Sequence, residues 1–349
     1  MISEVKHTIK AAQFGQPFFR FMLLASAAML MLQCAKPEKY KIVTDGRAQG
    51  TTYRITILVD SVADYAADYA QILNDIDKSL STYQSNSLIS RINAGETGLL
   101  LDEHFIRVMK GAYASHRETR GAFDPTLSPL IEYWGFGKTQ FGALDSSKVD
   151  SLLRYVGLGN VQMDSASRTL KMPKGFSLNF NASAQGYSVD ALSEFLLSKG
   201  VNDFMVEVGG ELRTHGQGQQ GPWRIGIDKP DERRTKEEHQ TILSLGSAAV
   251  ATSGNYRKFS VDSISGERYV HTLDPKTGYP VKHKLVSATV IGESCMMADA
   301  MATALLVMGF EEARHFLEKQ STYEAYLIYF DEEGAQRVYT TPGFQQYMK

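Results

Sequence analysis

The spacing of apolar residues along the chain follows two periods, which predict strands and helices. Residues 51–60 alternate in the period of a strand, because Tyr53, Ile55 and Ile57 fall on one face. Residues 63–80 instead carry apolar positions at helical spacing, as an amphipathic helix does. The same reasoning predicts helices over 105–119 and 189–198, and strands over 204–208, 223–228, 286–291 and 323–329.

The order of these elements favours an α+β fold with antiparallel sheets and packed helices. Residues 331–334 read as a hairpin turn, and no regular strand-helix-strand repeat with a glycine fingerprint is present in the sequence. The aromatic and turn-rich segment 121–137 predicts a loop, and the charged run 231–239 predicts a solvated insertion. We therefore expect one compact catalytic unit over residues 46–349, with a bilobal arrangement left open.

The start of the chain predicts export. Basic residues precede an apolar run, 21–32, which is shorter than the roughly 20 residues that span a bilayer, and Cys34 follows closely. We expect a lipoprotein signal over 1–34, a lipid on Cys34 and a polar tether over 35–45, which would hold the protein on the periplasmic side of a membrane. An uncleaved apolar anchor and simple secretion remain alternatives, because residues 31–33 lack the small residue preferred before such a cysteine.

Composition narrows the class of function. Apolar residues make up 43% of the chain, which suffices for a packed core. The net charge of -2, from 37 basic and 39 acidic residues, leaves no basic stripe for phosphate backbones, so we expect no nucleic-acid partner. Cys34 and Cys295 are the only cysteines, so acylation of Cys34 would leave no internal disulfide.

The segment 295–309 carries the most informative polar pair. Its Met, Ala and Leu content predicts a buried helix, on which Asp299 and Thr303 lie one turn apart on the same face. A carboxylate and a hydroxyl so placed form half of an oxygen-ligand site for a hard cation such as Mg²⁺. The alternative is a core salt bridge from Asp299 to a Lys or Arg, with Thr303 bonded back to its own helix.

A second candidate region, 271–280, places a histidine before a rigid turn. His271 could act as a general base near neutral pH, or could be a structural hydrogen-bonding group. Asp274 is expected to cap the turn. Glycine-containing loops at 50–52, 209–210 and 252–256 could offer backbone amides to phosphate oxygens, and the aromatics of 121–137 could stack a ring or fasten the loop to the core.

Taken in chain order, these segments resemble the ApbE family of FAD:protein FMN transferases, which are often exported lipoproteins. The resemblance covers roughly residues 49–309. It rests on the motifs QGTTYRI, LSTYQSNSLISRIN, GAFDPTLSPLIEYWGFG, NFNASAQGYSVD, VEVGGEL, AVATSGNYRKF, HTLDPKTGYPV and ADAMATAL, which stand in the family's order. It implies an ApbE-like, T-fold-like catalytic unit.

The resemblance also implies a reaction and a set of residues. The reaction is Mg²⁺-dependent cleavage of the FAD diphosphate, in which FMN passes to a Thr or Ser hydroxyl of a redox-complex subunit and AMP leaves. The family's metal ligands match Asp299, Thr303 and the backbone carbonyl of Ala182, and its proposed base matches His271. Its FAD contacts match Gln49, Tyr83, Ala122, Phe123, Asp124, Asn179, Gln185 and the backbone of Leu273.

Several positions depart from the family's pattern. Gln49 stands where Met is frequent, Asn179 where Asp is frequent, Gln185 where Lys is common and Ser128 where Gly is common. Loss of the Asp removes a charged acceptor, although an amide still offers both a donor and an acceptor. Two further hypotheses stay open. One is an Mg²⁺-dependent FAD pyrophosphatase that makes FMN and AMP, in which water replaces the acceptor hydroxyl at the same site. The other is a non-catalytic periplasmic FAD-binding lipoprotein, which the changes at Asn179 and Gln185 make conceivable.

Overall fold

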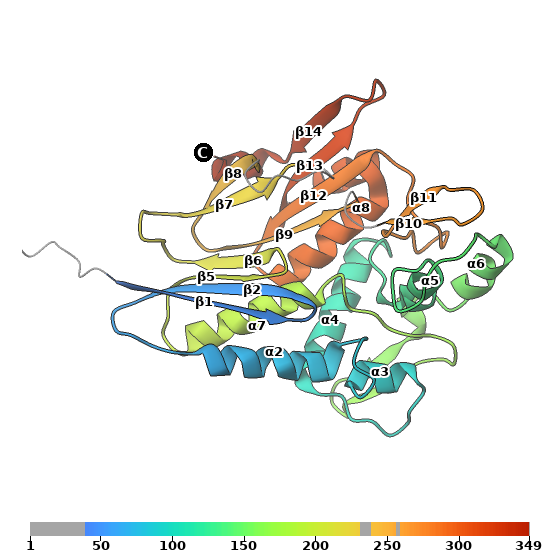
Figure 1. The fold of residues 1–349 in the computed structure, drawn as a ribbon, viewed down its shortest axis with the longest axis horizontal. Coiled ribbons are helices and arrows are strands. Elements are labelled where there is room, and N and C mark those ends of the chain that lie inside the picture. Colours follow the sequence, from blue (N-terminus) through green and yellow to red (C-terminus); the bar gives the residue numbers. More distant parts are fainter. Residues whose placement is uncertain (1–38, 231–238, 256–258, 349) are drawn as a thin grey trace, which may run out of the picture. The chain divides into compact units, whose positions relative to one another are not determined.

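The computed structural model describes residues 39–230, 239–255 and 259–348. The expected signal with Cys34, residues 35–38 of the expected tether, residues 231–238 of the charged insertion and residues 256–258 of the AVATSGNYRKF motif lie outside the described residues. Residues 40–45 of the expected tether instead belong to the first strand. From Tyr40 onward the chain belongs to one compact unit (Figure 1). Within the described part of the chain, no helix has the length and apolar character needed to cross a membrane.

An eight-stranded antiparallel sheet forms the centre of this unit. Its strand order is β1-β2-β5-β6-β9-β12-β13-β14 (Figure 1). The predicted alternation holds in β2, where Tyr53, Ile55 and Ile57 are all buried. The strands of this sheet are β1 (Tyr40–Ala48), β2 (Thr51–Val59), β5 (Asp203–Val208), β6 (Glu211–His215), β9 (Ala248–Gly254), β12 (Leu285–Gly292), β13 (Glu324–Phe330) and β14 (Gln336–Thr340).

Helices cover one face of the sheet, as Figure 1 shows for α2, α7 and α8. Apolar side chains of α2 and α7 pack on β2 and β5, while those of α8 pack on β12 and β13. Each such fully buried aliphatic side chain contributes roughly 1.5–3 kcal/mol relative to exposure. The helices are α2 (Ala66–Leu80), α3 (Leu88–Asn93), α4 (Glu103–Glu118), α5 (Ser128–Tyr133), α6 (Ser146–Leu153), α7 (Ala184–Ser198) and α8 (Cys295–Leu317).

Smaller elements complete the unit. The hairpin of β7 and β8 packs Ile227, Leu243 and Leu245 against side chains of β6, β9, β12 and β13. These elements are β7 (Trp223–Asp228), β8 (His239–Leu245), the hairpins β3 (Gln162–Asp164) with β4 (Thr169–Lys171) and β10 (Phe259–Val261) with β11 (Arg268–Val270), and the 3₁₀ turns η1 (Pro125–Leu127), η2 (Leu158–Asn160) and η3 (Pro342–Tyr347).

The helix α8 is buried on two sides, which explains its apolar composition. Met301 and Leu305 pack toward the sheet, whereas Ala300 and Ala304 pack in the cluster that contains Phe105 of α4. The helix continues to Leu317. The predicted helix therefore exists, and it lies between the sheet and the helical part of the unit.

A kink interrupts α8 at Gly309, the residue at which the predicted segment ends. Its φ of 76° and ψ of 175° are not helical, and this φ favours glycine. A Cβ there would lie 2.9 Å from the ring of His283, whose Nε2 hydrogen-bonds the carbonyl of Leu306. Glycine at this position allows both the turn and the packing of the imidazole.

Most predicted elements are confirmed with small shifts of their ends, and the antiparallel α+β class is confirmed. The hairpin turn at 331–334 joins β13 to β14. Two predictions were wrong in part. The helix expected over 189–198 begins at Ala184, and the loop expected over 121–137 contains η1 and α5. Asp124 starts η1 by accepting the Thr126 amide, and prolines at the first positions of η1 and α5 favour helical backbone.

Candidate active site

The helices α7 and α8 approach each other closely at Gly186. A Cβ atom at this position would lie 2.4 Å from the carbonyl oxygen of Cys295, so a larger residue would force the helices apart. The close approach lets the Gly186 amide donate a 3.1 Å hydrogen bond to Asp299 Oδ2. The carboxylate predicted to hold a metal is therefore held against the first turn of α7, the positive end of that helix.

Asp299 is a buried acid whose negative charge is stabilised by few neighbouring groups. Only 6% of its surface is exposed, and burial raises its pKa to about 7, although the Gly186 amide acts in the opposite direction. Among the described residues, no Lys or Arg forms an ion pair with it. The alternative of a core salt bridge therefore finds no cationic partner for Asp299 within residues 39–230, 239–255 and 259–348. Burying a carboxylate without a cation costs free energy, so a cation bound beside Asp299 would stabilise its charge.

Thr303 lies one turn further along α8 and faces the sheet. Its Oγ1 is 3.1 Å from the hydroxyl of Ser253 on β9. No group of three or more His, Cys, Asp or Glu side chains gathers to hold a metal among the residues that the structure describes. A metal here would therefore rely on oxygen donors of the kind that Asp299, Thr303 and the Ala182 carbonyl supply. That donor set fits Mg²⁺.

Gln49 lies in the tight turn between β1 and β2. It has a φ of 55° and is followed by Gly50 with a φ of 73°, the pair of positive values that a two-residue hairpin turn requires. Its Nε2 donates a 2.6 Å hydrogen bond to Ser188 of α7, while its Oε1 is buried with no partner among the described residues. A buried acceptor of this kind is suited to a ligand donor.

Asn179 and Gln185 lie on either side of the start of α7. Asn179 Oδ1 accepts a hydrogen bond from the backbone amide of Asn181, and the backbone amide of Asn179 donates one to the Pro125 carbonyl, both at 2.8 Å. Gln185 packs against the glycine loop after β5, since a Cβ on Gly209 would lie 2.7 Å from its Nε2. Both side chains therefore lie within three residues of Ala182 in sequence, and neither carries a charge.

The segment 122–124 directly precedes η1, and Asp124 is the N-cap of that turn. The Asp124 carboxylate is 8% exposed and is engaged within the protein. Its Oδ1 accepts from the amide and hydroxyl of Thr126, and its Oδ2 accepts from the amide of Leu158 at 3.0 Å. A ligand contact from this segment would therefore come from its backbone or from Ala122 and Phe123, both of which are largely buried.

The aromatic residues of 121–137 mainly fasten their segment to the core. Trp134 is fully buried, stacks on Phe141, contacts Tyr269 and donates from Nε1 to the carbonyl of Gly278 at 2.9 Å. Of the two interpretations that the sequence left open, packing therefore describes Trp134. By contrast, Tyr83 follows α2 with 64% of its surface exposed, and its ring is accessible to stack on a ligand.

His271 follows β11, at the start of the predicted rigid turn. Its ring meets Phe136 edge-on at 6.3 Å between centroids. The role of Asp274 as a turn cap is confirmed, because its oxygens accept from the amide of Lys276 and the hydroxyl of Thr277. Leu273 pairs with Pro280 across the turn. The imidazole is thus carried on an ordered loop, as a base would need to be.

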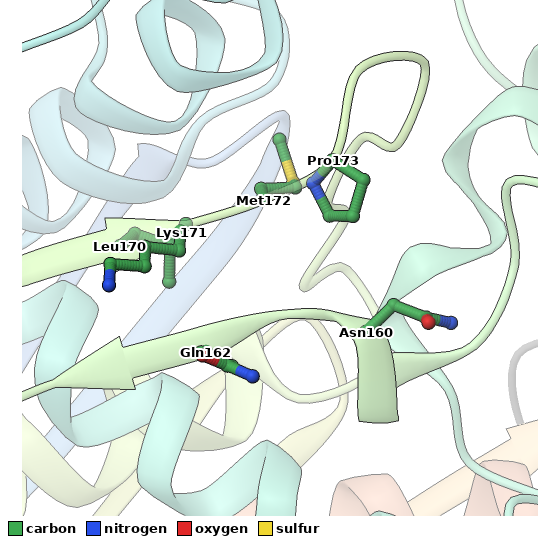
Figure 2. A pocket seen from close by; sticks show the side chains of 6 residues that line it. All are labelled: Asn160, Gln162, Leu170, Lys171, Met172 and Pro173. Atoms are coloured by element: carbon green, nitrogen blue, oxygen red, sulfur yellow. The ribbon is translucent and has the colours of Figure 1, made fainter.

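Two cavities differ in their relation to these residues. A shallow depression of about 490 Å³ is lined by residues 160, 162 and 170–173 (Figure 2), none of which belongs to the predicted site. A smaller cavity of about 110 Å³ is lined by the glycine loop 209–210 with Glu211, by residues 226–228 and by Thr252 and Gly254. The smaller cavity borders β9, which carries the Ser253 partner of Thr303. Thr252 and Gly254 alternate with Ser253 along β9 and share the face on which Val250 packs against the β7–β8 hairpin, so the predicted site residues line neither cavity.

Some residues of the site were not predicted from the sequence. Ser253 and Gly186 lie within recognised motifs, yet neither had a role until the structure showed their contacts with Thr303 and Asp299. The available signal for Gly186 was a glycine inside a helix, which costs about 1 kcal/mol relative to alanine and so indicates a packing reason. Ser253 carried no comparable signal.

The chain is similar to known proteins over most of its length. The sequence model of the ApbE family matches residues 49–327. An FAD:protein FMN transferase of Vibrio cholerae is 33% identical over 304 residues, covering 84% of this chain and 89% of that protein. One of Haemophilus influenzae is 30% identical over 326 residues, covering 89% and 93%.

Solved structures give the same result. The flavin transferase ApbE from Vibrio cholerae superposes with a TM-score of 0.79 at 30% identity, covering 88% of this chain and 99% of that one. The apo form of the Pseudomonas stutzeri flavinyl transferase ApbE also has a TM-score of 0.79 at 30% identity, covering 89% and 97%.

Proposed function

The chain belongs to the ApbE family, and on that premise we propose that it is an FAD:protein FMN transferase. Its reaction would join the FMN half of FAD to a Thr or Ser hydroxyl of an acceptor protein and release AMP. The observation that carries the proposal is Asp299, a buried carboxylate one turn from a hydroxyl on the same helix, which has one amide partner and no Lys or Arg partner in the part of the chain that the structure describes.

The proposed metal ligands are Asp299, Thr303 and the Ala182 carbonyl. Bound Mg²⁺ would offset negative charge on the diphosphate oxygens of FAD. Ser253 would assist by accepting a hydrogen bond from the Thr303 hydroxyl, 3.1 Å away, which leaves the lone pairs of the Thr303 oxygen free to coordinate the metal.

In the proposed step, His271 takes the proton of the acceptor hydroxyl. The hydroxyl oxygen then forms a bond to the phosphorus of the FMN half as the bond from that phosphorus to the AMP oxygen breaks, in line with the attack. The ordered turn around Asp274 supports this role by fixing the loop that carries the imidazole. The proton remains on His271 until solvent removes it.

The FAD contacts remain the proposed set. Tyr83 supplies an exposed ring for stacking, and the buried Gln49 Oε1 supplies an acceptor for a ligand donor. Asn179 and Gln185 supply neutral amides where charged residues are frequent in the family, so they would recognise an edge of FAD by hydrogen bonds alone. Residues 122–124 and Leu273 would contribute through backbone and apolar contacts.

We also propose export and membrane attachment through a lipid on Cys34, which lies outside the described residues. The supporting feature is the basic and then apolar order of the first 34 residues. The acceptor would then be a subunit of an exported or membrane redox complex. Replacing Cys34 with Ser should move the protein from the membrane fraction to the soluble fraction after cell lysis, and unchanged membrane retention would contradict the lipid anchor.

The central experiment incubates the protein with FAD and Mg²⁺, with and without a flavin-accepting redox subunit from the same cell. AMP release is followed by chromatography and the acceptor by its mass. AMP release that requires the acceptor, with a mass increase of one FMN group, supports transfer. Release without acceptor supports the pyrophosphatase alternative, and binding of FAD without AMP release supports the non-catalytic alternative.

A further inference from the structure

Asp190 is a buried acid to which the proposed reaction assigns no role. It ends the NFNASAQGYSVD motif and lies on α7 one turn beyond Gly186, with 4% of its surface exposed. A carboxylate so deep in a protein is rarely retained unless it is fully hydrogen-bonded. Its partners therefore indicate what it does.

The Asp190 carboxylate accepts hydrogen bonds from four donors. Oδ1 accepts from Arg213 Nη1 at 2.9 Å and from the Cys295 amide at 3.0 Å. Oδ2 accepts from the Ser294 hydroxyl at 2.7 Å and from the Met296 amide at 3.0 Å. Three of these donors belong to the beginning of α8, so a side chain of one helix caps the next.

This cap fixes the position of α8 along its own axis. The first amides of a helix have no partner within that helix, and a carboxylate is a favoured partner for them. Here Asp190 holds the amides of Cys295 and Met296, while Ser294 accepts the amide of Met297. A rotation or slip of α8 against α7 would break several of these bonds at once.

The cap and the metal ligands follow one register. The Asp190 carboxylate accepts a hydrogen bond from the Cys295 amide. One turn earlier on α7, the Gly186 amide donates to the Asp299 carboxylate, which lies one turn later on α8. Thr303 lies one further turn along α8, and Ala182 directly precedes Ser183, the N-cap of α7. The pairs therefore form a ladder along two helices that run in opposite directions.

We propose that Asp190 is a positioning residue that sets this register and thereby the spacing of the metal's oxygen ligands, an inference that rests on the proposed function. Mg²⁺ demands near-ideal octahedral geometry with oxygens at about 2.0–2.1 Å, so even a small slip of α8 weakens coordination. Residues that orient metal ligands typically change metal affinity about 10- to 100-fold when they are replaced.

The test compares Asp190→Asn with a matched control on the same helix. Asp190→Asn keeps the side-chain size but presents an NH₂ group to at least one of the donors that the carboxylate held. Glu194→Gln lies one turn further along α7, where Glu194 pairs with Arg107 at the surface and does not contact α8 through that pair. Ser294→Ala is a milder variant that removes one donor to Asp190.

Two measurements are made on the full chain. Binding of Mn²⁺ in the presence of FAD is titrated by the electron paramagnetic resonance signal of the free ion, and FMN transfer is measured against Mg²⁺ concentration. We expect Asp190→Asn to raise the Mn²⁺ dissociation constant and the half-saturating Mg²⁺ concentration by about tenfold or more. We expect transfer at saturating Mg²⁺ to recover to within about threefold of the wild type, and Glu194→Gln to match the wild type throughout.

A purely structural role predicts a different result. Asp190→Asn would then lower thermal stability while its folded fraction bound Mn²⁺ as the wild type does, and that outcome overturns the proposal. If Asp190→Asn does not fold, Ser294→Ala decides: a shift of about threefold in Mn²⁺ affinity supports the proposal, and an unchanged affinity overturns it. A wild-type protein that transfers no FMN with any divalent ion would instead contradict the proposed function.

Discussion

Two buried carboxylates, Asp190 on α7 and Asp299 on α8, differ in how completely their neighbours satisfy them. Both are under a tenth exposed, and both lie in the contact between the same two helices. Asp190 has four donors, including the guanidinium of Arg213, whereas the recorded partner of Asp299 is the single amide of Gly186. Burial alone therefore does not distinguish a structural acid from a reactive one.

This difference shows which of the two carboxylates can still bind a ligand. A carboxylate with four donors has little capacity left for a ligand, and its contribution is to hold elements together. A carboxylate with one donor keeps lone pairs available, and burial raises its pKa to about 7 because few groups stabilise its charge. A perturbed acid of this kind is where a cation would be most stabilising.

The largest expected effect comes from removing Asp299. Asp299→Ala should lower Mg²⁺-dependent AMP release by about a thousandfold, because the proposed metal loses its charged ligand. FAD affinity, measured by flavin fluorescence, should fall mainly when Mg²⁺ is present. Normal metal-dependent turnover in this variant would show that the comparison with Asp190 has assigned the ligand wrongly.

Replacement of His271 tests whether Asp299 is sufficient for the chemistry. His271→Ala should slow FMN transfer by about a hundredfold, the usual contribution of a general base, while FAD binding stays at the wild-type level. Rates are compared by acceptor mass at saturating FAD and Mg²⁺. Equal rates for the variant and the wild type would remove the proposed role of His271.

The contact at Gly186 tests the geometry that separates the two acids. Gly186→Ala places a Cβ against the Cys295 carbonyl, so we expect a loss of about 1–3 kcal/mol in the free energy of unfolding, measured in urea. Gly142→Ala is the matched control, because a Cβ there meets no atom within 4 Å. Equal stability of the two variants would mean that the helices can separate at little cost.

The last expected effect is a pH-dependent loss of stability in the metal-free protein. Burial raises the folded pKa of Asp299 to about 7, above the roughly 3.9 of an unfolded chain, so folding without metal takes up a proton between these values. Stability of the wild type should therefore fall, relative to Asp299→Asn, as pH rises from about 4 to 7, by on the order of 2 kcal/mol. Urea unfolding in EDTA at pH 5 and pH 8 measures this, and a pH-independent difference would contradict it.

The sequence predicted the local part of this site but not its tertiary part. Asp299 and Thr303 could be placed on one buried face because helical spacing depends only on nearby residues. The cap of α8 by Asp190 could not be predicted, because its partners lie more than a hundred residues away and no local pattern joins them. The central strand β9 was likewise missed, since both of its partners, β6 and β12, are distant in sequence. Strand β6 was missed although it forms a hairpin with the predicted strand β5.

The elements that were wrong in part show the same limit. The start of α7 was placed too late because the residues before Val189 are small or polar and give no apolar period. The helices within 121–137 were missed because glycine and proline at their ends resemble a loop in composition. The signal, Cys34 and the roles of the FAD-contact residues stay predictions.

The kink at Gly309 divides α8 into two segments in series. The first carries Asp299 and Thr303 and is tied to α7, whereas the second carries the surface pairs of Arg314 with Glu311 and Glu318. Because the helical backbone is interrupted at Gly309, a displacement of the second segment is not transmitted rigidly to Asp299 and Thr303 in the first. We therefore expect changes in the length or charge of the second segment to leave the positions of Asp299 and Thr303 unaltered.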